Sequence, residues 1–144
     1  MFERVLVPVD GSPASSNADG IAAALAGAFD GRVRFVFVLD IERLQNELGT
    51  WDDTFLAETV DRVRSHGEEM LRRAAAAAFE SHVPYEVAIL EGNTVEQIIL
   101  DAAAWHADVI VIGTHGRAMA LSAALGSKTA ELLRRSTLPV LVVR

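Results

Sequence analysis

Short apolar runs alternate with segments of helical periodicity along most of this chain, and this order constrains the fold more than any other feature. The runs are Arg4 to Val9, Val33 to Leu39, Tyr85 to Leu90, Val109 to Ile112 and Pro139 to Val143. Strands that read as continuous apolar runs and alternate with helices are typical of a parallel sheet covered on both faces. The sequence therefore predicts an α/β fold with five strands and four main helices between them.

The helical segments carry apolar positions on one face and signals at their ends. Ser12 is placed to cap a helix that starts at Pro13, and Asn93 with Glu96 is typical of a capping box. The expected core positions are Ala14, Ala18, Ile21, Ala22, Leu25 and Phe29 in the first helix, and Leu56, Val60, Val63, Met70, Leu71, Ala74 and Ala78 in the longest one.

Other features of these segments bear on the surface of the protein. In the longest helix, the Glu68/Arg72 and Glu69/Arg73 pairs have i,i+4 spacing on a second face. Residues 41–53 have a poor pattern and are predicted to form a long connection with one helical turn. His66, His82 and His106 are expected on helices, at the surface and without metal-ligand spacing.

The composition excludes several classes of function. The 144 residues are 51% hydrophobic, which predicts one domain, residues 1–144, with a core of its own. The chain contains no cysteine, so disulfides, thiol catalysis and cysteine-ligated metals are excluded. A net charge of −7 disfavours nucleic acid and anionic lipid as partners, because both require neutralisation of their phosphates.

The start of the chain and its apolar runs bear on where the protein resides. Met1 to Arg4 lacks a basic segment followed by a long apolar run, and no apolar stretch approaches the roughly 18 residues of a membrane span. We therefore expect a cytoplasmic protein that is neither exported nor inserted in a membrane.

The segment Ile112 to Thr129, IGTHGRAMALSAALGSKT, has glycines at a fixed spacing directly after an apolar strand. Two residues separate Gly113 from Gly116, and nine residues separate Gly116 from Gly126. Glycine lets backbone N–H groups approach a ligand without an intervening Cβ, and a helix that begins near Ser127 adds partial positive charge. We interpret this segment as an anion cradle, with phosphate groups as the favoured ligand.

Two common phosphate-binding motifs do not fit this spacing. A Walker A loop requires lysine directly after its last glycine, whereas Ser127 separates Gly126 from Lys128. A dinucleotide fingerprint requires three glycines after the first strand, where Gly11 stands alone. The GSKT string is therefore not a P-loop, and nicotinamide or flavin dinucleotides are poor candidates.

With the remaining pattern, G-x2-G-x9-G-[ST], the chain resembles the universal stress protein family. The resemblance covers the whole length and is carried by VLVPVDGS, VFVLD, EGNTVEQII, VIVIGTHG, LGSKTAELL and LPVLVV. It implies an open five-stranded parallel sheet of order 3-2-1-4-5 with helices on both faces. It also implies ATP binding, with ADP or AMP as alternatives, and a magnesium ion that accompanies the triphosphate rather than a preformed metal site.

The resemblance also carries the family's nucleotide contacts to matching residues of this chain. Asp10 would face the nucleoside and Val38 the adenine, while the glycine segment would follow the ribose and phosphates. The candidate nucleotide-binding residues are Pro8, Val9, Asp10, Val38, Ile112, Gly113, His115, Gly116, Arg117, Gly126, Ser127 and Lys128. We assign no catalytic residue, because no nucleophile is evident near His115 and Asp10 is the only acidic residue placed at the crevice.

Three functions remain open from the sequence. The first is an ATP-binding regulator of the stress response with little or no turnover, the second a nucleotide-free module that binds an unidentified protein, and the third a slow ATPase. Met119 and Ser122 stand where ATP-binding members often carry a glycine and a basic residue, which favours the second. Lys128 adds positive charge and favours the first. The apolar segment Leu138 to Val143, last in the sheet, predicts a homodimer paired through this edge, as in the family.

Overall fold

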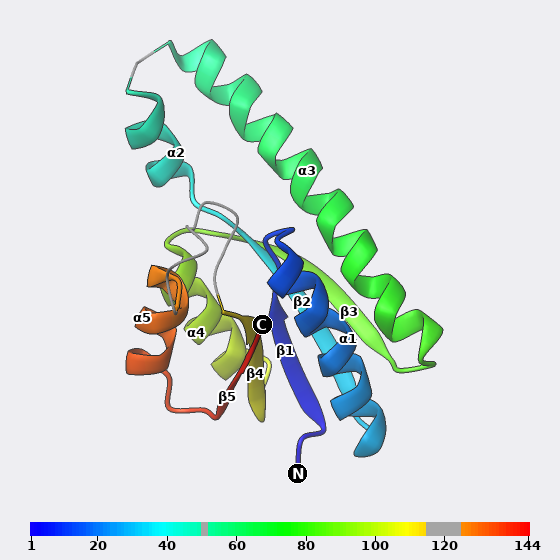
Figure 1. Ribbon diagram of the computed structural model, residues 1–144. Helices are drawn as coiled ribbons and strands as arrows, with labels where there is room; N and C mark the ends of the chain where they lie inside the picture. Colours follow the sequence, from blue (N-terminus) through cyan, green and yellow to red (C-terminus); the bar gives the residue numbers. More distant parts are fainter. Residues whose placement is uncertain (50–51, 115–124) are drawn as a thin grey trace.

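The computed structural model describes residues 1–49, 52–114 and 125–144, and its centre is one parallel sheet (Figure 1). The strands are β1 (Arg4–Pro8), β2 (Arg32–Leu39), β3 (Tyr85–Glu91), β4 (Val109–Gly113) and β5 (Val140–Val143). Their order is β3-β2-β1-β4-β5, and every neighbouring pair is parallel. The predicted fold and strand order are confirmed. The strand order reverses between β1 and β4, so a ligand crevice is expected at their carboxyl ends.

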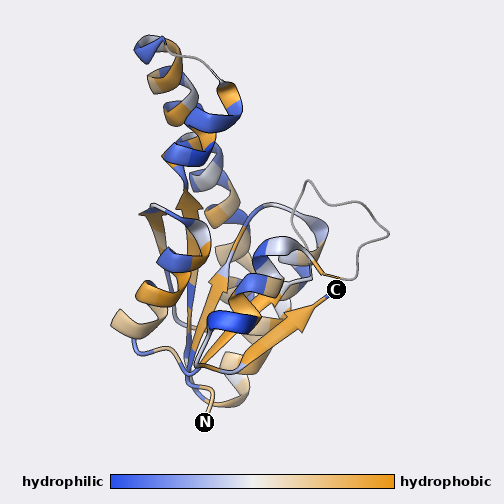
Figure 2. Cartoon of the chain, turned by 90° about the vertical axis from the view of Figure 1, so that its left-hand side faces the viewer, coloured by the Kyte–Doolittle hydropathy of each residue, from blue (hydrophilic) through white to orange (hydrophobic). Residues whose placement is uncertain are grey.

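Helices cover both faces of this sheet (Figure 1). In the described part of the chain they are α1 (Pro13–Ala28), α2 (Ile41–Leu48), α3 (Asp53–Glu80), α4 (Thr94–Ala104) and α5 (Ser127–Arg135). α1 and α3 pack on one face, and α4 and α5 pack on the other. Figure 2 shows the strands as the hydrophobic middle layer between them. α2 follows the carboxyl end of β2 and lies beyond the edge of the two layers.

The alternation of side chains along each strand divides the core into two parts. Val5 and Val7 of β1 are buried with residues of α1 and α3, whereas Leu6 is buried on the opposite face. All three side chains have no exposed surface. A strand covered in this way must be apolar at every position, and this burial explains why β1 reads as a continuous apolar run.

Some of the expected core positions are not buried. Ile21 of α1 and Phe29, the residue that follows α1, keep 43% and 40% of their surface exposed, so neither belongs to the core. On α3, the buried residues are confined to the stretch from Gly67 to Ala78. The earlier half of α3 projects beyond the sheet (Figure 1), which leaves Leu56, Val60 and Val63 only partly buried.

Residues 41–48 form a full helix rather than the predicted connection with one turn. The Asp40 side chain caps the start of α2 by accepting a hydrogen bond from Arg43 N at 3.0 Å. Gly49 ends the helix in the left-handed conformation, with φ of 64°. No residue of α2 is buried. Ile41 and Leu44 are partly buried against the first part of the core, so the helix is held by this contact and by its caps.

Gly67 of α3 is required by packing. A Cβ at this position would lie 2.4 Å from the Phe37 ring of β2, far closer than atoms pack. On propensity alone the glycine weakens α3 by about 1 kcal/mol relative to alanine. The structure gives the compensating reason, because the missing side chain lets α3 approach the end of β2.

Several local predictions about the helices have clear outcomes. Ser12 and Asn93 do cap α1 and α4, accepting from Ser15 N at 3.1 Å and Glu96 N at 3.1 Å. Arg72 pairs with Glu69 rather than with Glu68, and Arg73 also pairs with Glu69. His82 and His106 are exposed as expected but follow α3 and α4 instead of lying on them, with φ of 57° at both.

An ion pair connects β2 to α4 under the second face of the sheet. The guanidinium of Arg34 donates to both carboxylate oxygens of Asp101, at 2.8 and 2.9 Å. This hydrogen bonding to Asp101 raises the pKa of Arg34, against the opposing effect of burial. Bidentate pairs of this kind are geometrically specific. The pair therefore fixes the position of α4, whose first turn borders the crevice.

Candidate functional site

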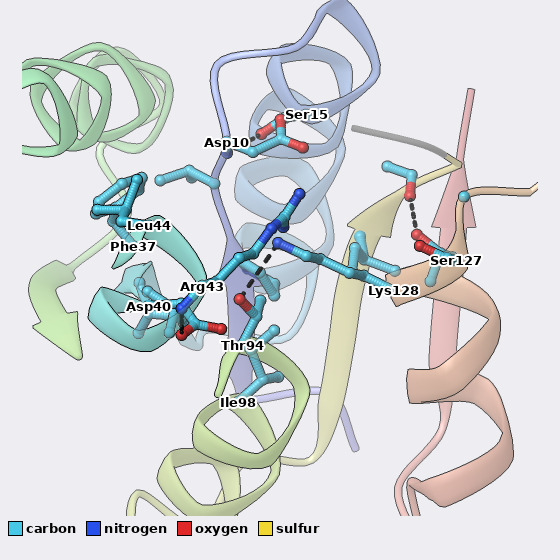
Figure 3. Close-up of a pocket in the computed structure, with 18 of the residues that line it drawn as sticks. Asp10, Ser15, Phe37, Asp40, Arg43, Leu44, Thr94, Ile98, Ser127 and Lys128 are labelled. Carbon is cyan, nitrogen blue, oxygen red and sulfur yellow. Dashed lines mark hydrogen bonds between the residues drawn. The ribbon is translucent and has the colours of Figure 1, made fainter. Parts of the chain in front are cut away.

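A cavity of about 350 Å³ opens at the carboxyl ends of β1, β2 and β4 (Figure 3). It lies where the strand order reverses, as expected for a ligand site in an open parallel sheet. Its lining consists of Pro8, Val9, Asp10, Ser15, Val36, Phe37, Val38, Asp40, Arg43, Leu44, Glu47, Thr94, Ile98, Ile112, Gly113, Gly126, Ser127, Lys128 and Thr129.

Most of the predicted nucleotide-binding residues are brought together in this lining. They are Pro8, Val9, Asp10, Val38, Ile112, Gly113, Gly126, Ser127 and Lys128. The predicted residues His115, Gly116 and Arg117, and the positions Met119 and Ser122, lie outside the described residues. The end of the first strand and the described ends of the glycine segment therefore line one cavity.

The first wall is fixed by a short network at the end of β1. Ser12 N donates to Asp10 Oδ1 at 2.8 Å, which is the turn geometry expected of an aspartate followed by glycine. Asp10 N in turn donates to Ser15 Oγ at 3.3 Å. These bonds hold the Asp10 carboxyl group at the first turn of α1, on the border of the cavity (Figure 3).

The second wall is the start of α5, which hydrogen bonds hold against the end of β4. Thr129 Oγ1 donates to Gly113 O at 2.9 Å, and Gly126 N donates to Thr114 O at 2.7 Å. Because the N-cap of α5 is Gly126, no side chain of that residue accepts from the first N–H groups of the helix. Such a helix start favours an anionic ligand.

Gly113 serves packing as well as access to this cavity. A Cβ built on Gly113 would lie 2.9 Å from two backbone atoms, Ala14 C and Ser15 N. The residue is therefore glycine because α1 crosses the end of β4 at very short range. Gly113 was interpreted from the sequence only as a ligand-binding residue, but the packing of α1 also requires glycine at this position.

The interior of the cavity is apolar and suits a flat, weakly polar group such as a nucleobase. Val36, Phe37 and Ile98 line it and are buried, with exposed fractions of 0%, 8% and 1%. Val38 and Ile112 line it and are partly buried. Ligand sites for small molecules commonly combine such an apolar interior with a few polar groups at the rim.

The rim of the cavity carries both cations and carboxylates. Lys128 Nζ donates to Thr94 Oγ1 of α4 at 3.3 Å. Burial, and after it the charge of the nearby Arg43, lower the pKa of Lys128. The carboxylates of Asp40, Asp10 and Glu47 each raise it by a smaller amount. Two positive groups thus lie close enough to repel each other, which an anion between them would relieve.

Asp10 is not the only acidic residue at the crevice, so that part of the sequence analysis is wrong. Asp40 and Glu47 also line the cavity, and both are engaged with Arg43. Arg43 was also not among the predicted site residues, because residues 41–53 were predicted to form a connection. A signal was present in the i,i+4 spacing of Arg43 and Glu47 directly after an apolar strand.

Comparison with known proteins agrees with this architecture. The universal stress protein family matches residues 1–144, the full length of the chain. The chain belongs to this family. A universal stress protein of Thermus aquaticus is 31% identical over 144 residues, covering 100% of both chains. One from Methanocaldococcus jannaschii is 29% identical over 146 residues, covering 100% of this chain and 83% of the relative.

Solved structures of universal stress proteins share the fold. UspA of Lactobacillus plantarum superposes with a TM-score of 0.85 at 24% identity, covering 99% of this chain and 98% of that one. A universal stress protein in complex with cAMP gives 0.71 at 23% identity, covering 99% and 97%. One from Archaeoglobus fulgidus in complex with dAMP gives 0.69 at 20% identity, covering 100% of both.

Within residues 1–49, 52–114 and 125–144, no helix has the length and apolar character that crossing a membrane requires. In the same ranges, no three histidine or acidic side chains are grouped to hold a metal ion.

Proposed function

We propose that this universal stress protein binds ATP and acts as a nucleotide-dependent regulator of a stress response in the cytoplasm, with little or no turnover. The observation that carries the proposal is the combination of an apolar interior with a helix start whose N-cap is Gly126, in one cavity at the strand-order switch. The interior suits adenine, and the helix start with Lys128 suits phosphates. Magnesium accompanies the nucleotide.

The ligands of related structures support an adenine nucleotide in this position. Two universal stress proteins with the same fold are complexes with cAMP and with dAMP. Both ligands contain adenine and a phosphate group. The shared chemistry fits a site with an apolar part and an anion-binding part, and ATP extends it by additional phosphates.

The proposal assigns regulation rather than hydrolysis because of how the acidic groups at the rim are engaged. Asp40 caps α2 and Glu47 pairs with Arg43, at 3.0 and 2.8 Å. A base that activates water must be within reach of the attacking oxygen and not committed elsewhere. An assay for released phosphate distinguishes the two functions, with turnover above an Asp10→Ala control as the result that favours an ATPase.

Replacing Ser127 by aspartate is expected to weaken ATP binding at least tenfold without lowering thermal stability. The new carboxylate stands at the first position of α5, where acidic residues stabilise a helix but repel phosphate groups. Titration calorimetry with ATP in magnesium measures the affinity, and a thermal melt without ligand measures the fold.

The matched control for this experiment is Ser16→Asp. Ser16 is an exposed residue in the first turns of α1 and does not line the cavity. Its substitution adds the same charge near another helix start and is expected to leave ATP affinity within about twofold. Equal losses in both variants, or no ATP binding by the wild-type protein, would contradict the proposed site.

The proposal includes a homodimer paired through the terminal strand. β5 lies at one end of the strand order and is apolar, and Leu141 keeps 41% of its surface exposed. An apolar edge strand is normally covered or paired. The opposite edge, β3, also exposes apolar side chains, including Tyr85 at 43%, which provides a matched comparison.

Leu141→Lys is expected to convert the dimer to a monomer, because a lysine on an edge strand opposes strand pairing. Tyr85→Lys places the same charge on the other edge and should leave the dimer intact. Size-exclusion chromatography with light scattering gives the mass of each variant. A monomeric wild-type protein, or dissociation by Tyr85→Lys instead, would exclude pairing through β5.

A further inference from the structure

α2 brings charged side chains to a cavity whose other walls are strand ends and helix starts. Arg43 lies on α2 and lines the cavity together with Leu44 and Glu47. Figure 3 shows the Arg43 side chain extending from α2 into the cavity toward the side of Asp10. A helix without a buried residue therefore contributes a long cationic side chain to the site.

The end of the Arg43 side chain lies beside Lys128, which comes from the opposite wall (Figure 3). The two groups are close enough for Arg43 to lower the pKa of Lys128. The lysine is held from the other side by its hydrogen bond to Thr94 Oγ1 at 3.3 Å. Two cations from α2 and α5 are thus held together at the mouth of one cavity, with Asp40, Asp10 and Glu47 acting against their repulsion. A phosphate between the two cations would stabilise this arrangement further.

Arg43 can bind a phosphate group while it keeps its existing hydrogen bond. Its Nε donates to Glu47 Oε1 at 2.8 Å, an i,i+4 pair whose two residues both line the cavity. A guanidinium carries its other N–H groups on two terminal nitrogens, in a planar arrangement that matches two oxygens of one phosphate. The pair with Glu47 orients the side chain and keeps these groups on the side that lines the cavity.

We propose that Arg43 is a direct ligand of the nucleotide phosphates, acting with Lys128, so that α2 recognises the charged part of the nucleotide. The inference rests on the proposed function and assigns a specificity-determining residue within the same site. With Arg43 in this role, α2 responds to the number of phosphates on the nucleotide rather than to the base. It also gives α2, which has no buried residue, a reason to be positioned at the mouth of the cavity.

The test compares wild-type protein with Arg43→Gln, Arg43→Lys and the control Arg62→Gln. Arg62 is an exposed arginine of α3 that does not line the cavity, so its substitution removes the same charge elsewhere. Titration calorimetry in magnesium measures the affinities for ATP, AMP and adenosine. Circular dichroism of each variant checks that the helical content is retained.

Arg43→Gln is expected to weaken ATP binding about tenfold while leaving adenosine affinity within about twofold, because charge-assisted hydrogen bonds to the phosphates are lost. Arg43→Lys should recover part of the ATP affinity, since it keeps the charge but not the planar fork. Arg62→Gln should bind all three ligands like the wild-type protein.

Two results would overturn the inference and leave the proposed function standing. One is unchanged ATP affinity in Arg43→Gln, and the other is an equal loss for ATP and adenosine, which would indicate a structural role for Arg43. A wild-type protein that binds none of the three ligands would overturn the proposed function and this inference together.

Discussion

The wild-type protein is expected to lose stability as the pH rises from 5 to 8, and the variant Asp19→Asn is expected not to show this loss. Asp19 lies on α1 and is buried, with 8% of its surface exposed. Within the described residues, its Oδ1 has no hydrogen-bond partner. Burial, and next the charge of Asp10, raise the pKa of Asp19 from 3.8 to about 7. The folded protein therefore holds a proton on Asp19 that the unfolded chain releases.

The sign of the effect follows from this difference. Below pH 3.8 the carboxyl group is protonated in both states, and its contribution to folding is constant. Between 3.8 and about 7 the folded state binds the proton more tightly, so the free energy of unfolding falls as the pH rises. The full difference is on the order of 4 kcal/mol, of which about 2 to 3 kcal/mol falls between pH 5 and 8.

Urea unfolding of both proteins at pH 5, 6, 7 and 8 measures this effect. The free energy of unfolding of the wild-type protein, relative to Asp19→Asn, should decline by about 2 to 3 kcal/mol from pH 5 to pH 8. Asp30→Asn is the control, since Asp30 is exposed at the end of α1 and asparagine tolerates its positive φ of 52°. Parallel pH profiles of the wild-type and Asp19→Asn proteins would show that Asp19 does not titrate with folding.

Asp19 illustrates which properties the sequence does not reveal. Its position among alanines of α1 shows helical spacing, but the depth of its burial depends on how α3 and the sheet pack around α1. The strands differ in this respect, because a strand buried on both faces needs an apolar residue at each position. β1 and β4 were predicted for this reason, within one residue of their ends.

The same distinction applies to the candidate site. Asp10 closely follows β1 and Gly113 ends β4, so the sequence placed both at the sheet edge where the cavity lies. The strand order came from the family resemblance, since local patterns do not encode which strands are neighbours. Arg43 was missed because residues 41–53 were predicted to be a connection, and its position at the cavity depends on the direction in which α2 leaves β2.

Gly113→Ala is expected to destabilise the fold by about 3 kcal/mol. The added Cβ would lie 2.9 Å from Ala14 C and from Ser15 N, and 3.0 Å from the Ala14 side chain. Backbone atoms cannot turn away as a flexible side chain can, so α1 or β4 must shift. Both elements are fixed at this point, since Thr129 Oγ1 donates to Gly113 O and Asp10 N donates to Ser15 Oγ.

Gly20→Ala is the matched control, because a Cβ at this exposed position of α1 meets nothing within 4 Å. It should stabilise the protein by about 0.5 to 1 kcal/mol, since alanine favours a helix over glycine. Urea unfolding gives both values at one pH. A loss below about 1 kcal/mol in Gly113→Ala would show that α1 adjusts to the added methyl group. In that case the requirement for glycine at the end of β4 would lie with the ligand instead of with the packing of α1.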